Sequence, residues 1–417
     1  MPQEAVVGHI SRCQVCSSEN LELVLAFGHQ ARVHGHLTKE MLHQPETKYP
    51  LNLYRCADCY LVQIDYAVDP KIVFSPEYPY HSGTTDMLVR NFRSLADEVV
   101  KKYGLTEKDL VVDIGSNDGT LLQGFKAKGV KVLGVEPTDN AKKANSEGIP
   151  TIQEFFTVKA AGDITTKHGR AKVVTAANVF AHINNLFEFL QGVQALLTDD
   201  GVFVSESQYL MDIIDKLEFD TIYDEHLRYY SLKPMQKLFS LVGFSLVDAE
   251  RISAAGGSIR AYAMKGERPL SDRAKELIAA EEAAGIYKKE TLKNFADRAI
   301  KAKHDLLKLL IDCKQKGARI ASVGAPGRSN TLLGFTNIDQ HLLDYLCERN
   351  TSPKIGLFSP GTHLPIVDEK KLMEEQPEYA LVLSWHIGEE LMRKIRQLGY
   401  KGKFIMPLPT PGIVENI

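Results

Sequence analysis

The stretch Val111–Leu122, with the sequence VVDIGSNDGTLL, constrains the fold more than any other part of the chain. A short apolar run passes into a glycine turn and then opens a helix. A second apolar run, Val132–Val135, follows and ends in Glu136 and Pro137. This order, with an acidic residue placed to bind a ribose, is typical of the first half of a doubly wound nucleotide-binding sheet. The sequence therefore predicts an α/β fold of the Rossmann-like type.

The chemistry of the glycine loop indicates the cofactor. Its spacing is G-x-x-x-G, whereas dinucleotide sites use G-x-G-x-x-G to bring backbone amides onto a pyrophosphate. Asp118 in the loop would repel a phosphate, but a carboxylate suits S-adenosylmethionine, which carries an ammonium and a sulfonium instead. The alternative is an ordinary strand–turn–helix without a ligand, and it leaves the placing of Glu136 unexplained. The residues expected to bind the cofactor here are Asp113, Gly115, Asn117, Asp118, Gly119, Glu136 and Pro137.

Bulk properties exclude several classes of protein. A chain of 417 residues is too long for one core and should form about two to four domains. With 44% hydrophobic and 25% charged residues and a net charge of -3, it offers no broad basic field to nucleic acid or anionic lipid. No apolar run has the length of a membrane span, and no signal peptide is recognisable. We therefore expect a cytoplasmic protein without nucleic-acid or membrane partners, its oligomeric state left open.

Two C-x-x-C pairs near the N-terminus, Cys13/Cys16 and Cys56/Cys59, predict a metal site. Each pair can chelate from one knuckle, and two knuckles complete a tetrahedral thiolate site without an open position, so the expected metal is a structural zinc ion. Unrelated reduced pairs or redox motifs are the alternatives. Between the pairs lie four histidines that we expect at the surface rather than on the metal: His29, His34, His36 and His43. The isolated Cys313 and Cys347 are expected in the core.

A turn-rich stretch, Phe74–Gly83, contains Tyr78 and Tyr80 and precedes a helix expected over 86–102. It is either a linker whose aromatic rings pack on the next domain or a lid that brings a phenol to the substrate. Strands are expected at 110–114, 131–136, 172–177 and 201–206.

Three further features of this domain concern the ligand crevice. Phe155 and Phe156 fall where an adenine could lie against a ring, or they belong to the core. Asn178 and His182 follow a strand, and the carboxyl ends of strands face the ligand crevice of such a sheet. A lone histidine is often structural, so both interpretations of His182 stay open.

The densest polar cluster of the chain is Thr221–Ser231, with the sequence TIYDEHLRYYS. A histidine of near-neutral pKa tuned by a carboxylate or a phenol is the usual requirement for general acid–base catalysis. A surface turn around packed tyrosines is the alternative. Further on, Ala255–Arg260 should be a glycine turn leading into a strand.

The C-terminal third starts with one or two long helices over 270–312 and continues with a second strand–loop–helix over 319–332. This loop contains an arginine and hydroxyl groups but no acid, which suits a phosphate at a helix N-terminus. Ser359–His363 and Leu383–His386 follow two further strand-like runs and could add contacts. A structural α/β domain with ordinary turns is the alternative.

The chain resembles the S-adenosylmethionine-dependent C-methyltransferases that act on nucleotide-linked 4-keto deoxysugars, such as the sugar C-3 methyltransferases of antibiotic pathways. The resemblance covers essentially the full length. The motifs that carry it are the two C-x-x-C pairs, Asp113–Thr120, Asn178–His182, Tyr223–His226, Gly324–Pro326 and Ser359–His363.

The resemblance implies a zinc-binding N-terminal module (1–75), a central methyltransferase domain (76–268) and a C-terminal Rossmann-like domain (313–417), with 269–312 as a helical spacer. The last domain would help to hold the nucleotide of the sugar. The residues expected to contact the substrate are Gly324, Pro326, Arg328, Ser329, Asn330, Thr331, Arg349, Ser359, Gly361, Thr362, His363 and Trp385.

The resemblance also implies a mechanism. A base removes the proton next to the ketone, and the enolate carbon then accepts the methyl group. By similarity, His226 is the base, Glu225 and Tyr223 orient it or stabilise the enolate oxygen, and His182 with Tyr78 or Tyr80 lines the same cavity. An oriented neutral imidazole contributes about 10²–10⁴ in rate.

Three departures from the family concern the substrate. Ala255 and Asp224 stand where the family commonly has histidines, and Gly327-Arg328-Ser329 replaces Ala-Lys-Gly. Arginine keeps the charge of lysine but turns a point charge into a planar fork. An O- or N-methyltransferase of nucleotide sugars is the runner-up enzyme, and a nucleotide-sugar binding protein without catalysis is the rival from another class.

Overall fold

The computed structural model describes residues 7–415, which form two compact units. Unit 1 consists of residues 7–22, 54–211 and 227–287, and unit 2 of residues 23–53, 212–226 and 288–415. Each unit therefore combines segments that are far apart in the sequence. The predicted division at residues 75, 268 and 312 follows the order of the chain and stays a prediction.

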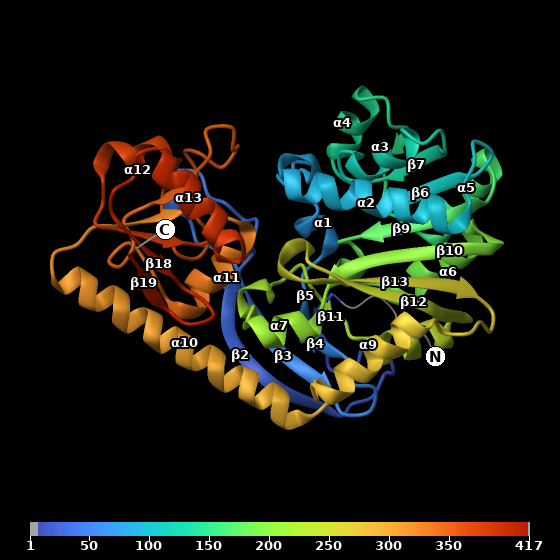
Figure 1. Ribbon diagram of the computed structural model, residues 1–417, viewed down its shortest axis with the longest axis horizontal. Coiled ribbons are helices and arrows are strands. Elements are labelled where there is room, and N and C mark those ends of the chain that lie inside the picture. Colours follow the sequence, from blue (N-terminus) through green and yellow to red (C-terminus); the bar gives the residue numbers. More distant parts are fainter. Residues whose placement is uncertain (1–6, 416–417) are drawn as a thin grey trace. The chain divides into compact units, whose positions relative to one another are not determined.

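Unit 1 is built on a seven-stranded sheet in the order β12-β13-β10-β9-β6-β7-β8 (Figure 1). The five strands from β10 to β8 are parallel, and β13 and β12 add antiparallel strands at one side. The strands are β6 (Leu110–Ile114), β7 (Lys131–Val135), β8 (Thr151–Ile152), β9 (Ala171–Ala177), β10 (Leu197–Gln208), β12 (Phe244–Ile252) and β13 (Ser258–Lys265). The four strands predicted from the sequence are confirmed, and β10 begins earlier than expected.

Helices cover both faces of this sheet, which confirms the doubly wound α/β architecture. On α2, the apolar residues Phe92, Leu95, Ala96 and Val99 recur with the helical period and are buried against the sheet. One face is covered by α2 (Asp86–Tyr103), α3 (Thr120–Lys126) and α4 (Asn140–Ser146), and the other by α5 (Val158–His168), α6 (Leu186–Leu196) and α8 (Leu232–Leu241).

The cysteine pairs lie at the ends of small strands that pack on the same core. Cys13, Cys56 and Cys59 belong to one hydrophobic cluster with Phe180 and Ala181. The strands of this region are β1 (Gly8–His9), which pairs with β5 (Tyr66–Ala67), and β2 (Leu21–Ala31), β3 (Lys48–Cys56), β4 (Val62–Ile64) and β11 (Arg228–Tyr229), which form a four-stranded sheet in the order β11-β4-β3-β2. The predicted strand at residues 61–64 is confirmed by β4.

Unit 2 contains a smaller four-stranded sheet in the order β14-β17-β18-β19, of which only the β18–β19 pair is antiparallel. Its strands are β14 (Ile320–Val323), β17 (Tyr379–Val382), β18 (Lys403–Met406) and β19 (Gly412–Val414), with the parallel pair β15 (Leu346–Glu348) and β16 (Ile366–Asp368) beside them. The helices of this unit include α10 (Lys289–Gln315), α11 (Gly327–Thr336), α12 (Lys370–Glu375), α13 (Gly388–Gln397) and most of α7 (Leu210–Lys216).

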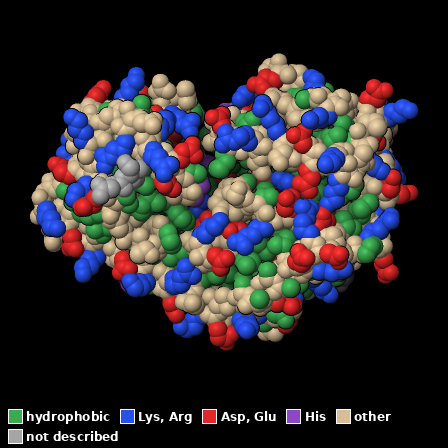
Figure 2. All heavy atoms as spheres, viewed as in Figure 1, with side chains coloured by type: hydrophobic (Ala, Val, Ile, Leu, Met, Phe, Trp, Pro, Cys, Tyr) green, Lys and Arg blue, Asp and Glu red, His purple; other side chains and the backbone are tan. Residues whose placement is uncertain are grey.

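The helical stretch predicted over 270–312 is confirmed as α9 (Asp272–Ala283) in unit 1 and α10 in unit 2. Cys313 and Cys347 are buried, as expected. Acidic and basic side chains are interspersed over the face seen in Figure 2, in keeping with the small net charge. Within residues 7–415, no helix is long and apolar enough to cross a membrane.

Candidate active site and zinc site

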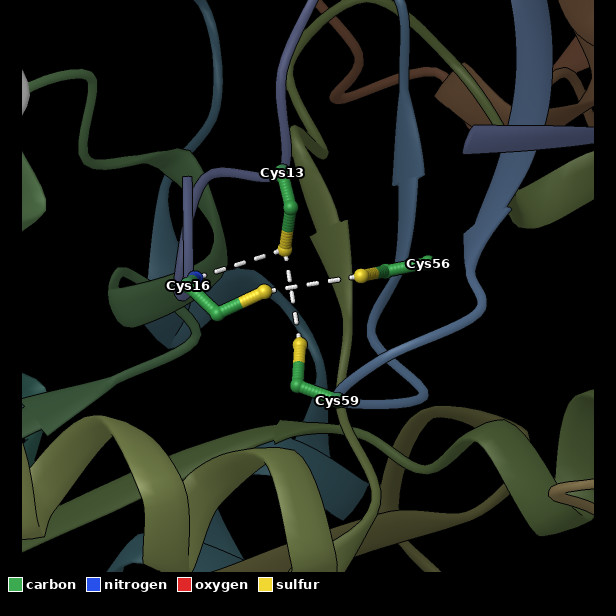
Figure 3. Close-up of side chains that lie close together, drawn as sticks. All are labelled: Cys13, Cys16, Cys56 and Cys59. Carbon is green, nitrogen blue, oxygen red and sulfur yellow. Dashed lines mark hydrogen bonds between the residues drawn. The ribbon is translucent and has the colours of Figure 1, made fainter. Parts of the chain in front are cut away.

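The four cysteines of the two C-x-x-C pairs converge in unit 1 (Figure 3). Their sulfur atoms all lie within 4.8 Å of one another. Cys13 Sγ is 3.4 Å from Cys59 Sγ, and Cys16 Sγ is 3.5 Å from Cys56 Sγ. The backbone amides of Val15 and Cys16 also point to Cys13 Sγ, each at 3.5 Å, which stabilises a thiolate there. Four converging thiols without an open position fit a structural Zn²⁺ ion.

The glycine loop between β6 and α3 has the backbone that its sequence requires. Gly115 has a φ of +66°, and a Cβ atom built there would lie 2.5 Å from a methyl carbon of Val179. Asn117 and Gly119 also adopt the left-handed conformation, with φ of 51° and 78°. Any side chain at position 115 would therefore push the loop away from the strand ends, where the ligand crevice of such a sheet lies.

Two buried carboxylates lie beside this loop. Glu136 accepts the backbone N–H of Asn117 at 3.0 Å and both the N–H and the hydroxyl of Thr138, at 2.9 and 2.6 Å. Asp113 accepts the Thr175 hydroxyl at 2.6 Å, and burial raises the pKa of Asp113 to about 7. Carboxylates lie at the ends of β6 and β7, and the loop itself has no cation that could bind a phosphate. These features fit the amino acid and ribose portions of S-adenosylmethionine. Pro137 follows Glu136 and is half-buried.

Asp118, which was predicted to bind the cofactor, already has several partners within the protein. Its carboxylate accepts the N–H of Gly83 at 3.0 Å and the hydroxyl of Thr120 at 2.6 Å, and it lies 3.4 Å from Lys143 Nζ. Its side chain is only 3% exposed. Asp118 therefore fixes the segment that follows Tyr80, and a contact with the cofactor stays a prediction.

The tyrosine-rich segment closes directly onto the glycine loop. The carbonyl of Tyr80 accepts the side-chain amides of Asn117 and Asn140, each at 3.0 Å, and the N–H of Ser82 donates to Asn117 Oδ1 at 2.9 Å. The backbone of the segment is thus tied to the loop while 42% of Tyr80 stays exposed. This arrangement favours the lid interpretation over a plain linker.

His182 and Tyr78 both contact the ring of Phe74. The Phe74 ring is 5.7 Å from the His182 ring and 5.4 Å from the Tyr78 ring, measured between centroids. His182 ends the short 3-10 helix η3 (Phe180–His182), which follows β9. Between them, Asn178 adopts a left-handed φ of 58° and donates its N–H to the Glu206 carbonyl at 2.7 Å. The structure therefore brings these predicted residues together at the carboxyl end of β9.

The two phenylalanines proposed for the adenine differ in their surroundings. Phe155 is 39% exposed. Phe156 is half-buried, packs edge-on against Phe189 with 5.5 Å between centroids, and lies against Gly192. Phe156 thus has the core role that was the alternative, whereas Phe155 is available at the surface.

The predicted base lies in unit 2, on the loop between the 3-10 helix η4 (Phe219–Thr221) and residue 227. His226 Nδ1 is 2.9 Å from the carbonyl oxygen of Thr221. A carbonyl can only accept, so Nδ1 carries the proton and Nε2 keeps its lone pair. Burial lowers the pKa of His226 to about 4, and the Tyr223 ring lies 4.0 Å from the imidazole between centroids. The imidazole is therefore neutral and oriented at physiological pH.

Asp224 holds a distant segment against this loop. Its carboxylate accepts the N–H of Val33 at 3.0 Å, and the Val33 carbonyl accepts the side-chain amide of Asn330 at 2.7 Å. Both peptide groups of Val33 are thereby fixed. This contact explains the departure at position 224: the carboxylate anchors Val33, and burial raises its pKa to about 6.

Next to Val33, two histidines expected at the surface are not there. His34 and His36 are half-buried, and burial lowers the pKa of His34 to about 3 and of His36 to about 4. His34 Nδ1 lies 3.9 Å from the buried carboxylate of Glu225. The prediction of surface positions is wrong for these two, because the Val33 anchor draws them inward, and correct for the exposed His29 and His43.

Arg328 forms a buried ion pair that the sequence did not predict. Its Nε and Nη2 donate to the two oxygens of Asp220 at 2.8 and 2.7 Å, and Nη2 lies 3.4 Å from Glu218. Trp385 Nε1 donates to the same Asp220 carboxylate at 2.8 Å, with the guanidinium 5.2 Å from the indole centroid. The pair is bidentate, so Nε and Nη2 of the guanidinium already bind groups of the protein. A contact of Arg328 or Trp385 with the substrate stays a prediction.

The rest of the predicted phosphate loop lies at the start of α11. Ser329, Asn330 and Thr331 are buried, and the Ser329 hydroxyl donates to the Pro326 carbonyl at 2.6 Å. Gly324 has a φ of +76°, and a Cβ atom there would lie 2.6 Å from Ser384 Oγ. The loops after β14 and β17 are thus in close contact, as the carboxyl ends of adjacent parallel strands should be.

A carboxylate of the protein already occupies the Ser359–His363 turn. Glu46 accepts the N–H of Gly361 at 2.8 and 3.0 Å and lies 2.9 Å from His363 Nε2. Ser359 Oγ and Thr362 Oγ1 are 2.8 Å apart. The turn therefore binds a carboxylate of the protein itself, and a contact with the substrate stays a prediction. Arg349, after β15, is exposed.

The glycine loop, the parallel sheet with two antiparallel strands and the four-cysteine cluster define a methyltransferase that uses S-adenosylmethionine and contains a zinc-binding segment. Three protein-family models match the chain. They are described as "Putative zinc binding domain" (residues 13–74), "Methyltransferase domain" (88–249) and "C-methyltransferase C-terminal domain" (253–409).

The chain is also similar to curated proteins and to solved structures. C-methyltransferase NovU of Streptomyces niveus is 32% identical over 414 residues, 98% of either chain. Sphingolipid C9-methyltransferase 2 of Gibberella zeae is 35% identical over 113 residues, 25% of this chain and 22% of that protein. Magnesium protoporphyrin IX methyltransferase of Synechocystis, solved with bound SAH, covers 43% of this chain and 84% of its own at 14% identity and a TM-score of 0.33. The chain belongs to the S-adenosylmethionine-dependent C-methyltransferase family of NovU.

Proposed function

We propose that this C-methyltransferase methylates a carbon next to the ketone of a nucleotide-linked 4-keto deoxysugar, by way of an enolate. The observation that carries the proposal is the state of His226. Its Nδ1 proton is held by the Thr221 carbonyl, and burial keeps the ring neutral, which leaves Nε2 as a base. A methyl group can be attached to a saturated carbon only after that carbon has lost a proton, and a ketone makes the adjacent proton acidic enough for an imidazole to remove.

In the proposed reaction, His226, Tyr223 and Glu225 have separate roles in the transfer of the proton. His226 Nε2 takes the proton next to the ketone, and the electron pair of the broken C–H bond moves onto the ketone oxygen. The imidazolium that results shares its Nδ1 proton with Thr221 O and returns the other proton to solvent. The Tyr223 ring lies tilted against the imidazole and is proposed to orient it, and Glu225, the neighbour of His226 in the sequence, is proposed to stabilise the imidazolium. S-adenosylmethionine, when bound, would supply an electrophilic methyl group to the enolate carbon, with the S–CH3 bond breaking and S-adenosylhomocysteine leaving.

The remaining predicted residues enter the proposal as contributors to the two ligand sites. We assign the cofactor to the loop of Gly115, Asn117 and Gly119, with Glu136 on the ribose and Asp113 at the end of β6. His182, Tyr78 and Tyr80 are proposed to contact the sugar. The nucleotide is assigned to unit 2, at the loops of Gly324–Thr331 and Ser359–His363.

The test uses S-adenosylmethionine with an isotopically labelled methyl group and a panel of nucleotide-linked 4-keto-6-deoxy sugars, followed by carbon NMR of the product. The expected result is label on a ring carbon next to the ketone. The matched control is the same sugar with the ketone reduced to an alcohol, which has no acidic proton and should accept no label. Label on oxygen or nitrogen would overturn the proposal in favour of an O- or N-methyltransferase.

A second measurement isolates the proton transfer. In deuterium oxide, with S-adenosylhomocysteine in place of the methyl donor, the enzyme should exchange the proton next to the ketone for deuterium. His226→Gln should abolish this exchange. Exchange at the wild-type rate in the variant would remove His226 from the role of base.

A further inference from the structure

The residue that follows His226 is held by the zinc-binding segment. Leu227 accepts two hydrogen bonds on its carbonyl, from the side-chain amide of Gln14 at 3.1 Å and from the N–H of Ile64 at 3.2 Å. Gln14 lies within the first C-x-x-C knuckle, between Cys13 and Cys16, and its own N–H donates to Gln63 Oε1 at 2.8 Å. The knuckle therefore fixes the chain immediately after the proposed base.

The same dipeptide fixes the loop that contains His182. The N–H of Leu227 donates to the Ala181 carbonyl at 3.0 Å, and Arg228 Nη1 donates to the Ile183 carbonyl at 2.6 Å. Arg228 Nη2 reaches the Asn184 carbonyl at 3.3 Å. The peptide groups on both sides of His182 are thus held by Leu227 and Arg228, so the position of the imidazole depends on these two residues.

Arg228 is a buried cation that pairs with no carboxylate among the described residues. It is 2% exposed, and among residues 7–415 the guanidinium has hydrogen bonds to backbone carbonyls and to Tyr230 but no ion pair with a carboxylate. Burial lowers the pKa of Arg228, and a negative charge on Cys13 would act in the opposite direction. A buried charge without a counterion is costly, so an excess of negative charge nearby is needed to keep it.

The four cysteines provide that excess. Four thiolates outweigh one divalent cation, so a tetrathiolate zinc site is a net anion. Arg228 and Gln63 are paired across the β11–β4 ladder, and Gln63 binds the knuckle through Gln14. Cations close to zinc thiolates stabilise the bound metal in the same way as other outer-shell partners, whose loss costs about 10–100-fold in metal affinity.

We propose that Arg228 is a positioning residue for the methyl transfer: the zinc tetrathiolate is its counterion, and its guanidinium fork fixes the loop of His182. The metal site is then more than a support for the N-terminal segment, because the charge of the zinc site retains the arginine that orders the active-site loop. The proposal rests on the proposed function only in taking His182 as part of the substrate site.

The test compares Arg228→Met, which removes charge and fork, with Arg228→Lys, which keeps the charge but loses the fork. Zinc transfer to a chelating dye should be at least about tenfold faster from Arg228→Met and within about twofold of the wild type from Arg228→Lys. Both variants should shift the imidazole NMR signal of His182, assigned by its loss in His182→Gln. Chelation of zinc from the wild type should move that signal in the same direction.

Arg12→Met is the matched control, because Arg12 is adjacent to the same knuckle but its side chain is 54% exposed. It should change neither the zinc transfer nor the His182 signal. In kinetics, both Arg228 variants should lower kcat by about tenfold while KM for S-adenosylmethionine stays within about twofold.

An unchanged His182 signal in Arg228→Met, or equal zinc loss from the methionine and lysine variants, would overturn the proposal. The zinc and NMR measurements need no turnover, so they decide it even if the sugar substrate is wrong. Should Arg228→Met fail to fold, Arg228→Lys and zinc chelation still test it through the His182 signal.

Discussion

The imidazole of His226 is the proposed base, so a single substitution should separate catalysis from binding. His226→Gln is expected to lower kcat about 10²–10⁴-fold and to leave the Kd for S-adenosylmethionine within about twofold. Single-turnover methyl transfer and calorimetric titration measure the two effects. His29→Gln, at an exposed position of the same unit, is the control and should behave as the wild type.

The pH dependence tests the environment of that imidazole. Burial lowers the pKa of His226 to about 4, and the base is active only when it is neutral. The value of kcat/KM should therefore rise with pH through about 4 and be flat from about pH 6 to 8. An ordinary histidine would give a rise centred near about pH 6.5, and such a profile would contradict the buried geometry.

Substitutions of Asp224 test the hydrogen bond by which its carboxylate anchors Val33. Asp224→Ala leaves the Val33 N–H without its acceptor and should lower the free energy of unfolding by about 1–3 kcal/mol, measured by urea denaturation. Asp224→Asn keeps an acceptor oxygen and should cost little. If the alanine and asparagine variants were equally stable, the hydrogen bond to Val33 would have no part in the anchor.

Asp224 should also make the free energy of unfolding depend on pH. Burial raises the pKa of Asp224 to about 6 from the usual 3.8, so the folded protein keeps a proton that the unfolded chain has lost. The contribution of Asp224 to stability therefore falls as pH rises from about 4 to about 6 and is constant above that. Over this window, Asp224→Asn should gain about 3 kcal/mol relative to the wild type. A difference that does not change with pH would contradict the raised pKa.

One buried carboxylate joins helices α8 and α9. Glu281 on α9 accepts the hydroxyls of Tyr209 and Tyr287, and it also accepts the first N–H of α8, from Leu232, at 3.0 Å. The N-cap residue Ser231 makes no capping bond with its side chain, so a residue of another helix provides the cap.

Glu281→Ala should lower the free energy of unfolding by about 3 kcal/mol, since it leaves three buried donors without an acceptor. Chemical denaturation measures this loss. Glu282→Ala is the matched control: its exposed pair with Lys233 should be worth less than about 1 kcal/mol. Equal losses in the two variants would mean that the buried carboxylate does not hold the helices together.

At this scale, local patterns predicted most of the elements. Apolar runs bounded by glycine turns gave the strands of the large sheet, and the spacing of the cysteines gave the metal site, because both depend on residues close together in the chain. The ion pair of Arg328 with Asp220 and the contact of Glu46 with Gly361 join residues 108 and 315 positions apart. Nothing in a local pattern indicates such a partner, so Arg328 and the Ser359–His363 turn were predicted as free to bind a phosphate.

For the whole molecule, the interleaving of segments predicts that a fragment cut at the linear boundaries will not fold by itself. A fragment of residues 288–417 lacks Asp220 and Glu218, which pair with Arg328, and it lacks Val33, which binds Asn330. It would therefore contain a buried cation without a counterion. We expect this fragment to unfold without cooperativity and its only tryptophan, Trp385, to emit as a solvated indole.

The substitution Arg328→Leu should then have opposite effects in the two contexts. In the fragment it removes the uncompensated charge and should improve cooperativity and solubility. In the full chain it leaves Asp220 and Glu218 buried without their cation and should cost about 3–5 kcal/mol in the free energy of unfolding. Urea denaturation followed by Trp385 fluorescence measures both. A fragment that unfolds cooperatively with the emission of the full chain would show instead that the C-terminal segment folds by itself, and that the pair with Asp220 is dispensable for its core.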